Sequence, residues 1–149
     1  ENSKCPEIKI IDFGSAFYSY EKMYPYIQTR WYRAPEVLAT ILSQQRKTTF
    51  SPAIDSWSIA CVLFETRTNT PLFVANSSEH LFLLTNAFCE HTLDKLINRL
   101  LEGKPNPKQL ATDPRLLSFV NLLQHHFTQD PQYRIKATEA LTHPFLSVD

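Results

Sequence analysis

Four short motifs in this sequence bring carboxylate, guanidinium and aromatic side chains to separate points along the chain. Carboxylates bind metal ions, and guanidinium groups bind carboxylates and phosphates. These residue types could therefore form a site that binds a metal ion or a phosphate group. The first motif alone is a weak indication, because Asp and Gly are also common in a turn after a strand. The motifs are, in order, Asp12-Phe13-Gly14, Arg33-Ala34-Pro35-Glu36, Asp55-Ser56-Trp57-Ser58 and Asp130-Pro131-Gln132-Tyr133-Arg134-Ile135, the last followed by Ala140-Leu141-Thr142-His143-Pro144-Phe145.

Glycine is scarce in this chain. An average content of about 7% would give roughly 10 glycines, and there are two, Gly14 and Gly103. Two distant glycines cannot form a GxGxxG motif or a Walker-type loop. The sequence therefore excludes a glycine-rich cradle for phosphate.

Charge and composition exclude further classes of function. The chain has 15 basic and 15 acidic residues, so its overall charge gives no reason to expect a nucleic-acid partner. No apolar run approaches the roughly 18 residues of a membrane span, and the polar start is unlike a signal peptide. The three cysteines are odd in number and widely spaced, which is typical of reduced thiols in an intracellular protein, nuclear or cytoplasmic. The five histidines show no metal-binding spacing.

The elements that must position these motifs begin with a short β-branched stretch. Residues 7–11 predict one strand that ends at Asp12. A single strand leaves backbone donors and acceptors unpaired, so we expect its partner to lie in a segment absent from this chain. Residues 12–34 show no sustained periodicity, which predicts a long loop of the kind that is usually functional or disordered.

The rest of the chain predicts helices joined by polar loops. Pro35 and Glu36 suit the first turn of a helix over 35–42, because proline fits that turn and a carboxylate favours the positive end of the helix. The polar residues 43–51 predict a surface loop. Apolar periodicity and capping residues predict four outer helices, over 78–88, 93–102, 115–127 and 137–142.

A further helix, over 52–67, is apolar on almost every side. A helix of this kind is usually buried, so we place it at the centre of the domain. The expected fold is therefore mostly α-helical, with one short strand and a helical bundle around a buried central helix. The apolar residues of this helix lie on several faces: Ile54, Trp57, Ile59, Cys61, Val62, Leu63 and Phe64.

With its motifs in this order, the chain resembles the eukaryotic protein kinases, specifically the second half of their C-terminal lobe. Thr29-Arg30-Trp31-Tyr32-Arg33 before Ala-Pro-Glu is similar to the CMGC group, which contains the cyclin-dependent, MAP, DYRK and CDC-like (LAMMER) kinases. Gly14-Ser15-Ala16 and Tyr24-Pro25-Tyr26-Ile27-Gln28 are most similar to the DYRK and CDC-like branch. The resemblance implies a partial kinase domain over 1–149, with an activation segment over 12–36 and the helical base of the C-lobe over 52–146.

The resemblance implies that Asp12, with Phe13 and Gly14, contacts the cofactors ATP and Mg²⁺. Asp12 would hold the Mg²⁺ that bridges the ATP phosphates, because charge on the transferring phosphoryl group must be neutralised. Thr29 would support catalysis by helping to position the substrate hydroxyl. The alternative for Asp12 is a turn carboxylate that accepts a hydrogen bond from its own backbone.

Tyr26 is implied to be a regulatory phosphorylation site, with Tyr24 as a second candidate. A phosphate adds a charge of about −1.5 to −2, and the two arginines of Arg30-Trp31-Tyr32-Arg33 are close enough in sequence to pair with it. The same four residues would dock the protein substrate. The alternative for Tyr26 is an aromatic side chain that packs in the fold.

Glu36 and Arg134 are implied to form a buried ion pair that anchors the activation segment. Removing one partner of such a pair typically costs ~3–5 kcal/mol. Asp55 would hold the backbone of the catalytic loop, with simple capping of its helix as the alternative. Trp57 would pack beneath the activation segment.

The sequence departs from a complete kinase in the elements that catalysis needs. It contains no Val-Ala-Ile-Lys strand, no helix-C glutamate and no His-Arg-Asp catalytic loop, and it begins at Glu1. Phosphoryl transfer is mostly positioning and charge stabilisation, so we expect the chain alone to be inactive and to need an upstream N-lobe and catalytic-loop segment. Without the helices of a full lobe, we also expect exposed apolar surface at Trp57, Cys61, Val62 and Phe64.

Three functions remain open from the sequence. The first is a fragment of a Ser/Thr or dual-specificity kinase whose parent transfers the γ-phosphoryl group of ATP to hydroxyls on protein substrates. The second is a non-catalytic, pseudokinase-like module that binds a protein partner, against which the intact Asp-Phe-Gly argues mildly. The third is a degenerate remnant that never folds, which a cooperative melt would contradict.

Overall fold

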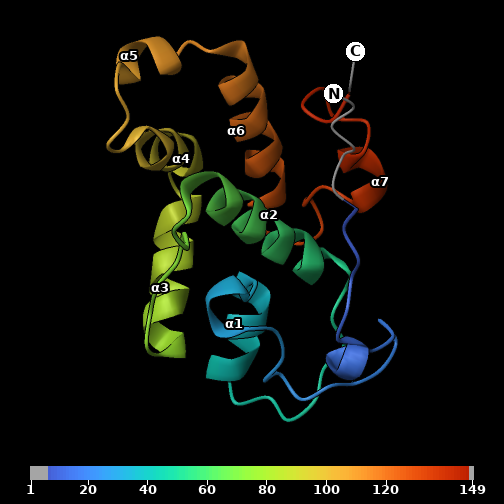
Figure 1. The fold of residues 1–149 in the computed structure, drawn as a ribbon. Coiled ribbons are helices and arrows are strands. Elements are labelled where there is room, and N and C mark those ends of the chain that lie inside the picture. Colours follow the sequence, from blue (N-terminus) through green and yellow to red (C-terminus); the bar gives the residue numbers. More distant parts are fainter. Residues whose placement is uncertain (1–6, 148–149) are drawn as a thin grey trace.

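The computed structural model describes residues 7–147, and Figure 1 shows their elements. The mostly helical fold class is confirmed, and each predicted helix forms within two residues of its expected bounds. One short helix, α5, was not predicted. The elements are the 3-10 turns η1 (Phe13–Ser15) and η2 (Arg30–Tyr32), followed by α1 (Pro35–Leu42), α2 (Ala53–Thr68), α3 (Ser78–Cys89), α4 (Thr92–Leu101), α5 (Pro107–Leu110), α6 (Pro114–His126) and α7 (Ala137–Ala140).

Capping residues set the helix ends. The side chain of Ser77 accepts a hydrogen bond from the His80 backbone N–H at the start of α3, and Asp113 does the same for Arg115 at the start of α6. Helix α2 ends at Asn69, whose φ of 60° is the left-handed conformation that often closes a helix. These local interactions explain why the helix bounds could be predicted from the sequence.

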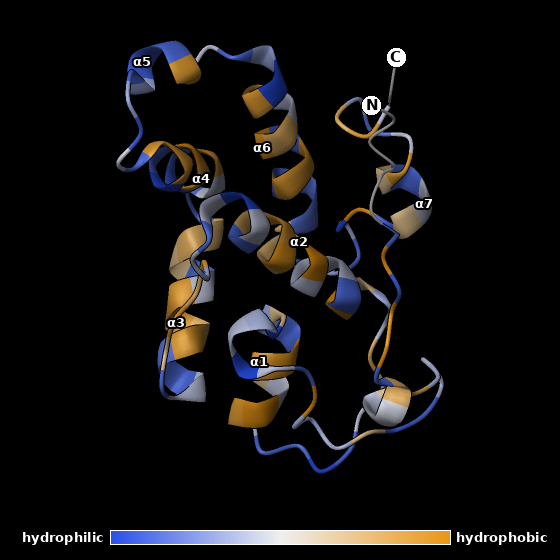
Figure 2. Cartoon of the chain, in the orientation of Figure 1, coloured by the Kyte–Doolittle hydropathy of each residue, from blue (hydrophilic) through white to orange (hydrophobic). Residues whose placement is uncertain are grey.

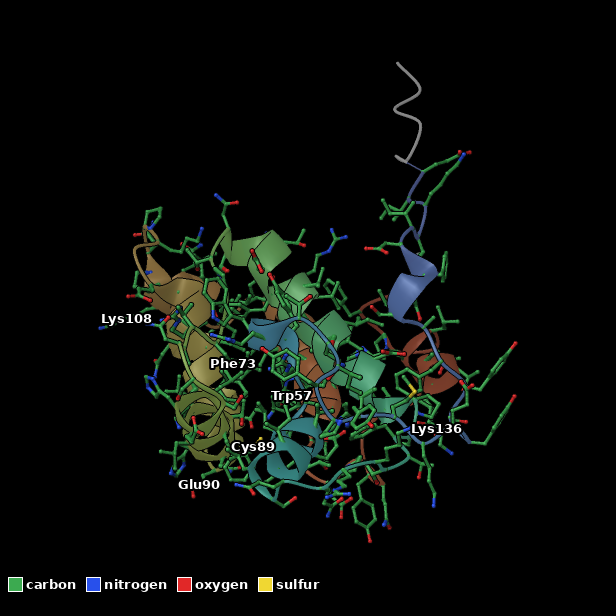
Figure 3. All side chains as sticks on the ribbon, turned by 90° about the horizontal axis from the view of Figure 1, so that it is seen from below. Trp57, Phe73, Cys89, Glu90, Lys108 and Lys136 are labelled. Carbon is green, nitrogen blue, oxygen red and sulfur yellow. The ribbon has the colours of Figure 1, made fainter. Side chains whose placement is uncertain are left out.

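An aromatic cluster lies where α2, α3 and α6 meet. The ring of Trp57 stacks on Phe73 with centroids 5.7 Å apart and meets the edge of Phe127 at 5.0 Å. Phe88 packs edge-on against both phenylalanines, at 5.1 and 5.2 Å. Figure 3 shows Trp57 and Phe73 together inside the ring of helices. Helix α1 packs against α3, while α2 and α4 both pack against α6, so the cluster is enclosed on several sides.

The expectation that Trp57, Cys61 and Phe64 expose apolar surface is wrong. Each of these side chains is at most 2% exposed, because the helices of this chain close around that face of α2 by themselves. The expectation holds for Val62, which is 52% exposed, as is Ile59 at 48%. Helix α2 is therefore buried on one face and apolar but exposed on another, rather than buried all round.

The predicted strand over 7–11 is also wrong. These residues have no regular secondary structure, and Ile8, Ile10 and Ile11 are 79% exposed or more. β-Branched residues favour a strand only when a neighbouring strand takes up the backbone hydrogen bonds, and residues 7–147 supply none here.

The predicted long loop and the predicted surface loop lie side by side. Apart from η1 and η2, residues 12–34 are irregular, and one antiparallel bridge joins Met23 to Thr48 in the polar loop 43–52. Figure 2 shows this loop as hydrophilic, in contrast to the apolar residues where α2, α3 and α6 meet. No helix within residues 7–147 has the length and apolar character to span a bilayer.

Candidate functional site

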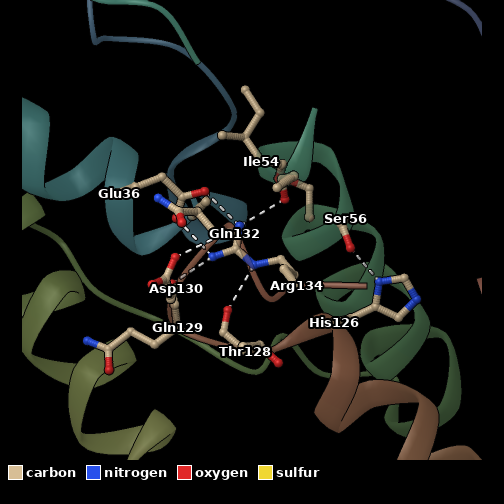
Figure 4. A network of polar contacts seen from close by, with 12 residues as sticks. Glu36, Ile54, Ser56, His126, Thr128, Gln129, Asp130, Gln132 and Arg134 are labelled. Carbon is tan, nitrogen blue, oxygen red and sulfur yellow. Dashed lines mark hydrogen bonds and ion pairs between the residues drawn. The ribbon is translucent and has the colours of Figure 1, made fainter. Parts of the chain in front are cut away.

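The structure brings Glu36 and Arg134 together although they are 98 residues apart in sequence. Glu36 lies in the first turn of α1, and Arg134 lies between α6 and α7. The two guanidinium Nη groups donate to the two carboxylate oxygens over 2.7 and 2.9 Å, a bidentate contact that Figure 4 shows. The Arg134 side chain is fully buried and that of Glu36 is 21% exposed, so this is a largely buried ion pair.

Arg134 uses all five of its N–H donors. Besides the two bonds to Glu36, its Nε and Nη groups donate to the backbone carbonyls of Thr128, Ala53 and Gln129, over 2.8–3.0 Å. Its guanidinium also lies 5.3 Å from the centre of the Trp57 ring. The charge is therefore buried with every donor satisfied, which joins α1, the start of α2 and the segment after α6 at one point.

A second buried polar contact supports the same region. The Ser56 hydroxyl donates to the Ile135 carbonyl and lies 2.7 Å from Nδ1 of His126, so Nδ1 carries the proton that binds Ser56. Burial lowers the pKa of His126, and the neighbouring charges of His125, His143 and Arg134 lower it further. Burial therefore favours the neutral imidazole at this contact.

The predicted docking stretch, Arg30-Trp31-Tyr32-Arg33, is fixed to the rest of the fold by hydrogen bonds from its side chains. Arg30 donates through Nη1 to the Asn76 carbonyl over 2.7 Å, and the Trp31 indole donates to the Ala75 carbonyl over 3.0 Å. The Tyr32 hydroxyl donates to the Glu65 carboxylate over 2.6 Å, and this bond raises the pKa of Tyr32 to about 12. Residues 30–32 are thus fixed to α2 and to the segment before α3.

Gln28 is a positioning residue that the sequence reasoning missed. Its backbone has a φ of 62°, in the left-handed region. The amide nitrogen donates to the Ile54 carbonyl and the Ser58 hydroxyl, and the amide oxygen accepts from the Ala34 N–H. One amide therefore ties the end of the long loop to the starts of α1 and α2.

Tyr26 lies against the second arginine of the docking stretch. The Arg33 guanidinium carbon is 4.2 Å from the centre of the Tyr26 ring, which is itself 67% exposed. Arg33 is buried and donates through Nε to the carbonyls of Ile27 and Gln28, but its Nη1 has no hydrogen-bond partner within residues 7–147. The neighbouring guanidinium groups of Arg30 and then Arg33 hold the pKa of the Tyr26 hydroxyl below its usual range.

Asp12 has an uncommon backbone conformation at the start of η1. Its φ of 63° and ψ of 64° are left-handed, and its side chain makes no capping hydrogen bond to the turn. The alternative of a turn carboxylate bonded to its own backbone is therefore not what the structure contains. Asp12, Phe13 and Gly14 are all exposed.

Two other predicted residues lie apart from the ion pair. Thr29 is exposed and precedes η2 without a capping hydrogen bond from its side chain. Asp55 is exposed in the first turn of α2, and its carboxylate likewise accepts no hydrogen bond within residues 7–147. Partial loss of water around that carboxyl raises its pKa. The simple capping alternative for Asp55 is thus not seen either.

Comparisons with known proteins identify the family to which the sequence belongs. The sequence model described as "Protein kinase domain" matches residues 1–146. Relatives include mitogen-activated protein kinase mpkC of Aspergillus clavatus, at 33% identity over 98% of this chain, and mitogen-activated protein kinase 12 of Mus musculus, at 33% over 97%. Mitogen-activated protein kinase 6 of Arabidopsis thaliana is also 33% identical. The chain spans 38–41% of the length of these relatives. From the matched motifs, the paired Glu36 and Arg134 and these relatives, we conclude that the chain belongs to the eukaryotic protein kinase domain family, with relatives in the CMGC group.

Proposed function

We propose that this chain is part of a Ser/Thr or dual-specificity kinase whose complete protein transfers the γ-phosphoryl group of ATP to hydroxyls on protein substrates. In this proposal, residues 12–36 are the activation segment and residues 52–146 the helical base, within a partial domain over 1–149. The observation that carries it is the bidentate contact of Glu36 with Arg134, which ties the end of the activation segment to the base. The MAP kinase relatives support the same assignment.

We assign Asp12, with Phe13 and Gly14 beside it, to the cofactors ATP and Mg²⁺. The Asp12 carboxylate fits a metal ligand because it is exposed and makes no bond to its own turn. When bound, Mg²⁺ supplies neutralisation of the phosphate charge. One carboxylate is too little to hold it, and no group of three or more metal-ligating side chains occurs in residues 7–147. The chain alone is therefore expected to be inactive without an upstream N-lobe and catalytic-loop segment.

The docking stretch is assigned to protein substrates. Arg30 and Trp31 are anchored to the Asn76 and Ala75 carbonyls, which supports a rigid platform rather than a free loop. A rigid platform loses little conformational entropy when a peptide binds. Thr29, exposed at the edge of this platform, is assigned to help position the substrate hydroxyl.

Tyr26 is assigned as the regulatory phosphorylation site. Its hydroxyl is accessible, and the unpartnered Nη1 of Arg33 beside it is a buried donor that lacks an acceptor. A phosphate on Tyr26 would supply acceptor oxygens and a charge of about −1.5 to −2 to Arg30 and Arg33. Tyr24 remains a second candidate.

Within the CMGC group, we place the chain in the DYRK and CDC-like branch. The support is Gly14-Ser15-Ala16 after Asp-Phe, and Tyr24-Pro25-Tyr26-Ile27-Gln28.

A chimera tests the proposed function. The segment of mitogen-activated protein kinase 12 that precedes the part aligned with residues 12–149 is joined to residues 12–149, and transfer of ³²P from γ-labelled ATP to a protein substrate is measured. We expect transfer that falls by at least about 100-fold in Asp12→Asn, because the metal ligand is lost. Asp94→Asn, at an exposed carboxylate on α4, is the matched control and should leave transfer unchanged.

The same experiment can contradict the proposal. A chimera that melts cooperatively and binds ATP, yet transfers phosphate equally well in Asp12→Asn, would remove Asp12 from the chemistry. A folded chimera with no transfer at all would favour the non-catalytic, partner-binding alternative.

A further inference from the structure

A cavity of about 530 Å³ lies between the second half of α2, the first half of α6 and Phe145 in the segment after α7. The two helices pack against each other, as Figure 1 shows. The volume is within the range of protein pockets that bind small molecules. None of the lining residues takes part in the contact of Glu36 with Arg134 or belongs to residues 12–36, so this α2–α6 cavity is separate from the candidate site.

The inner end of the α2–α6 cavity is apolar. Leu116 and Phe119 are buried, and Leu63 and Phe145 are half-buried beside them. The rings of Phe119 and Phe145 have centroids 5.0 Å apart and are tilted by 47°, so Phe145 holds the segment after α7 against α6. A ring or an alkyl chain placed at this end would be removed from water and would contact apolar side chains.

The outer end of the cavity carries two cations and one anion. Arg67 and Arg115 are exposed, and neither guanidinium lies within ion-pair distance of a carboxylate in residues 7–147. Asp113 also lines the cavity, but its carboxylate accepts the Arg115 backbone N–H over 3.0 Å at the start of α6. The two positive charges exceed this one negative charge, so a single negative charge on a ligand would balance them.

We propose that the α2–α6 cavity binds an apolar monocarboxylate, a small molecule with a ring or alkyl body and one carboxylate. The body would lie against Phe119 and Phe145, and the carboxylate would accept hydrogen bonds from the arginines of the outer end. A guanidinium suits this partner because its fork of donors matches the two oxygens of a carboxylate. A phosphate ester carries about −1.5 to −2 charges, which is more than the excess positive charge, and Asp113 would repel it.

Titration of the 149-residue chain with naphthoate tests the site. Shifts of the Phe119 and Phe145 ring signals are followed by NMR, and the neutral naphthamide is the matched ligand. We expect saturable binding that is at least about tenfold tighter for naphthoate than for naphthamide, because only the carboxylate gains charge-assisted hydrogen bonds. Added salt should reduce this preference, since both arginines are exposed.

Substitutions separate the charged end from the apolar end. Arg67→Gln with Arg115→Gln should bring the two affinities to within about twofold of each other, since the comparison of ligands and variants isolates the charge contact. Arg99→Gln, at an exposed arginine on α4, is the matched control and should keep the preference. Thr66→Trp, at an exposed lining position, should weaken both ligands by about tenfold because the indole occupies the cavity. Thermal melts check that each variant is folded.

Competition with decanoate shows whether the inner end takes an alkyl chain as well as a ring, and displacement of naphthoate supports the same site. Equal affinity for naphthoate and naphthamide in the wild type would overturn the proposal. A preference that persists in the double arginine variant, or that is lost equally in Arg99→Gln, would overturn it too, as would no saturable binding of either carboxylate. None of these outcomes bears on the proposed function, because the chimera measures transfer through Asp12.

Discussion

Two buried arginines, one in the helical base and one in the loop segment before α1, differ in whether all of their donors are paired. Arg134 and Arg33 are each 3% exposed. Arg134, in the helical base, donates from every N–H to a carboxylate or a carbonyl. Arg33, in the loop segment, uses Nε for two carbonyls and leaves Nη1 without a partner within residues 7–147.

The difference is between a buried guanidinium with every donor paired and one with an unpaired donor. Burying a charge is tolerable when all its donors are satisfied, and a buried donor without an acceptor costs about 1–3 kcal/mol. Arg134 meets this condition within the described chain, although the buried Trp57 indole Nε1 near it also has no partner there. Arg33 does not meet it, and the proposed phosphate on Tyr26 would supply the missing acceptor.

The largest expected effect is on the stability of the helical base. Arg134→Ala removes five hydrogen bonds and leaves the Glu36 carboxylate poorly paired, so the free energy of unfolding should fall by ~3–5 kcal/mol. Thermal and urea melts of the 149-residue chain measure it. Arg99→Ala is the control, because its contact with Glu102 spans 3.9 Å between exposed side chains and contributes at most about 1 kcal/mol. Equal losses in the two variants would remove the distinction between the regions.

A smaller and more local effect is expected at Arg33. Arg33→Ala loses the bonds to the Ile27 and Gln28 carbonyls but also removes the unpartnered Nη1, so the cost should be about 1–2 kcal/mol. Amide exchange should quicken within residues 26–33 and stay unchanged in α2 and α6. If protection falls throughout the chain, the loop segment belongs to the same cooperative unit as the base.

The smallest expected effect is a loss of stability of the helical base at acidic pH. The lowered pKa of His126 means that, below the unfolded-state value of about 6.5, the unfolded chain takes up the proton more readily than the folded one. Stability is therefore full above that pH and falls as the pH drops below it. His143, whose pKa burial also lowers, contributes in the same direction.

Melts between pH 7.5 and 5.5 test this dependence. His126→Gln should flatten the curve, while His80→Gln, at an exposed position on α3, should leave it as in the wild type. A curve of the same slope in His126→Gln would assign the acid sensitivity to other groups.

The helices and the ion pair could both be predicted from the sequence, but for different reasons. Pro35, Ser77 and Asp113 act on backbone groups a few residues away, so helix starts follow from local chemistry. The pairing of Glu36 with Arg134 came from family motifs, since nothing local joins residues 98 positions apart.

The predictions from the sequence failed where a contact with a distant part of the chain decides the local structure. Residues 7–11 have the composition of a strand but lack a partner in the described chain. Gln28 and Glu65 act through contacts with Ile54 and Tyr32 that no spacing rule reveals. The burial of Trp57 also depended on Phe73 and Phe127, which come from two other segments.

The geometry at Arg134 limits which side chains can occupy that position. A lysine would bring three donors from a single nitrogen, so it could not serve two carboxylate oxygens and three carbonyls that surround a plane. A saturation library at this codon, sorted for folded protein, should return arginine almost exclusively. Much of the surface of this domain can be varied by design, but position 134 has to remain arginine.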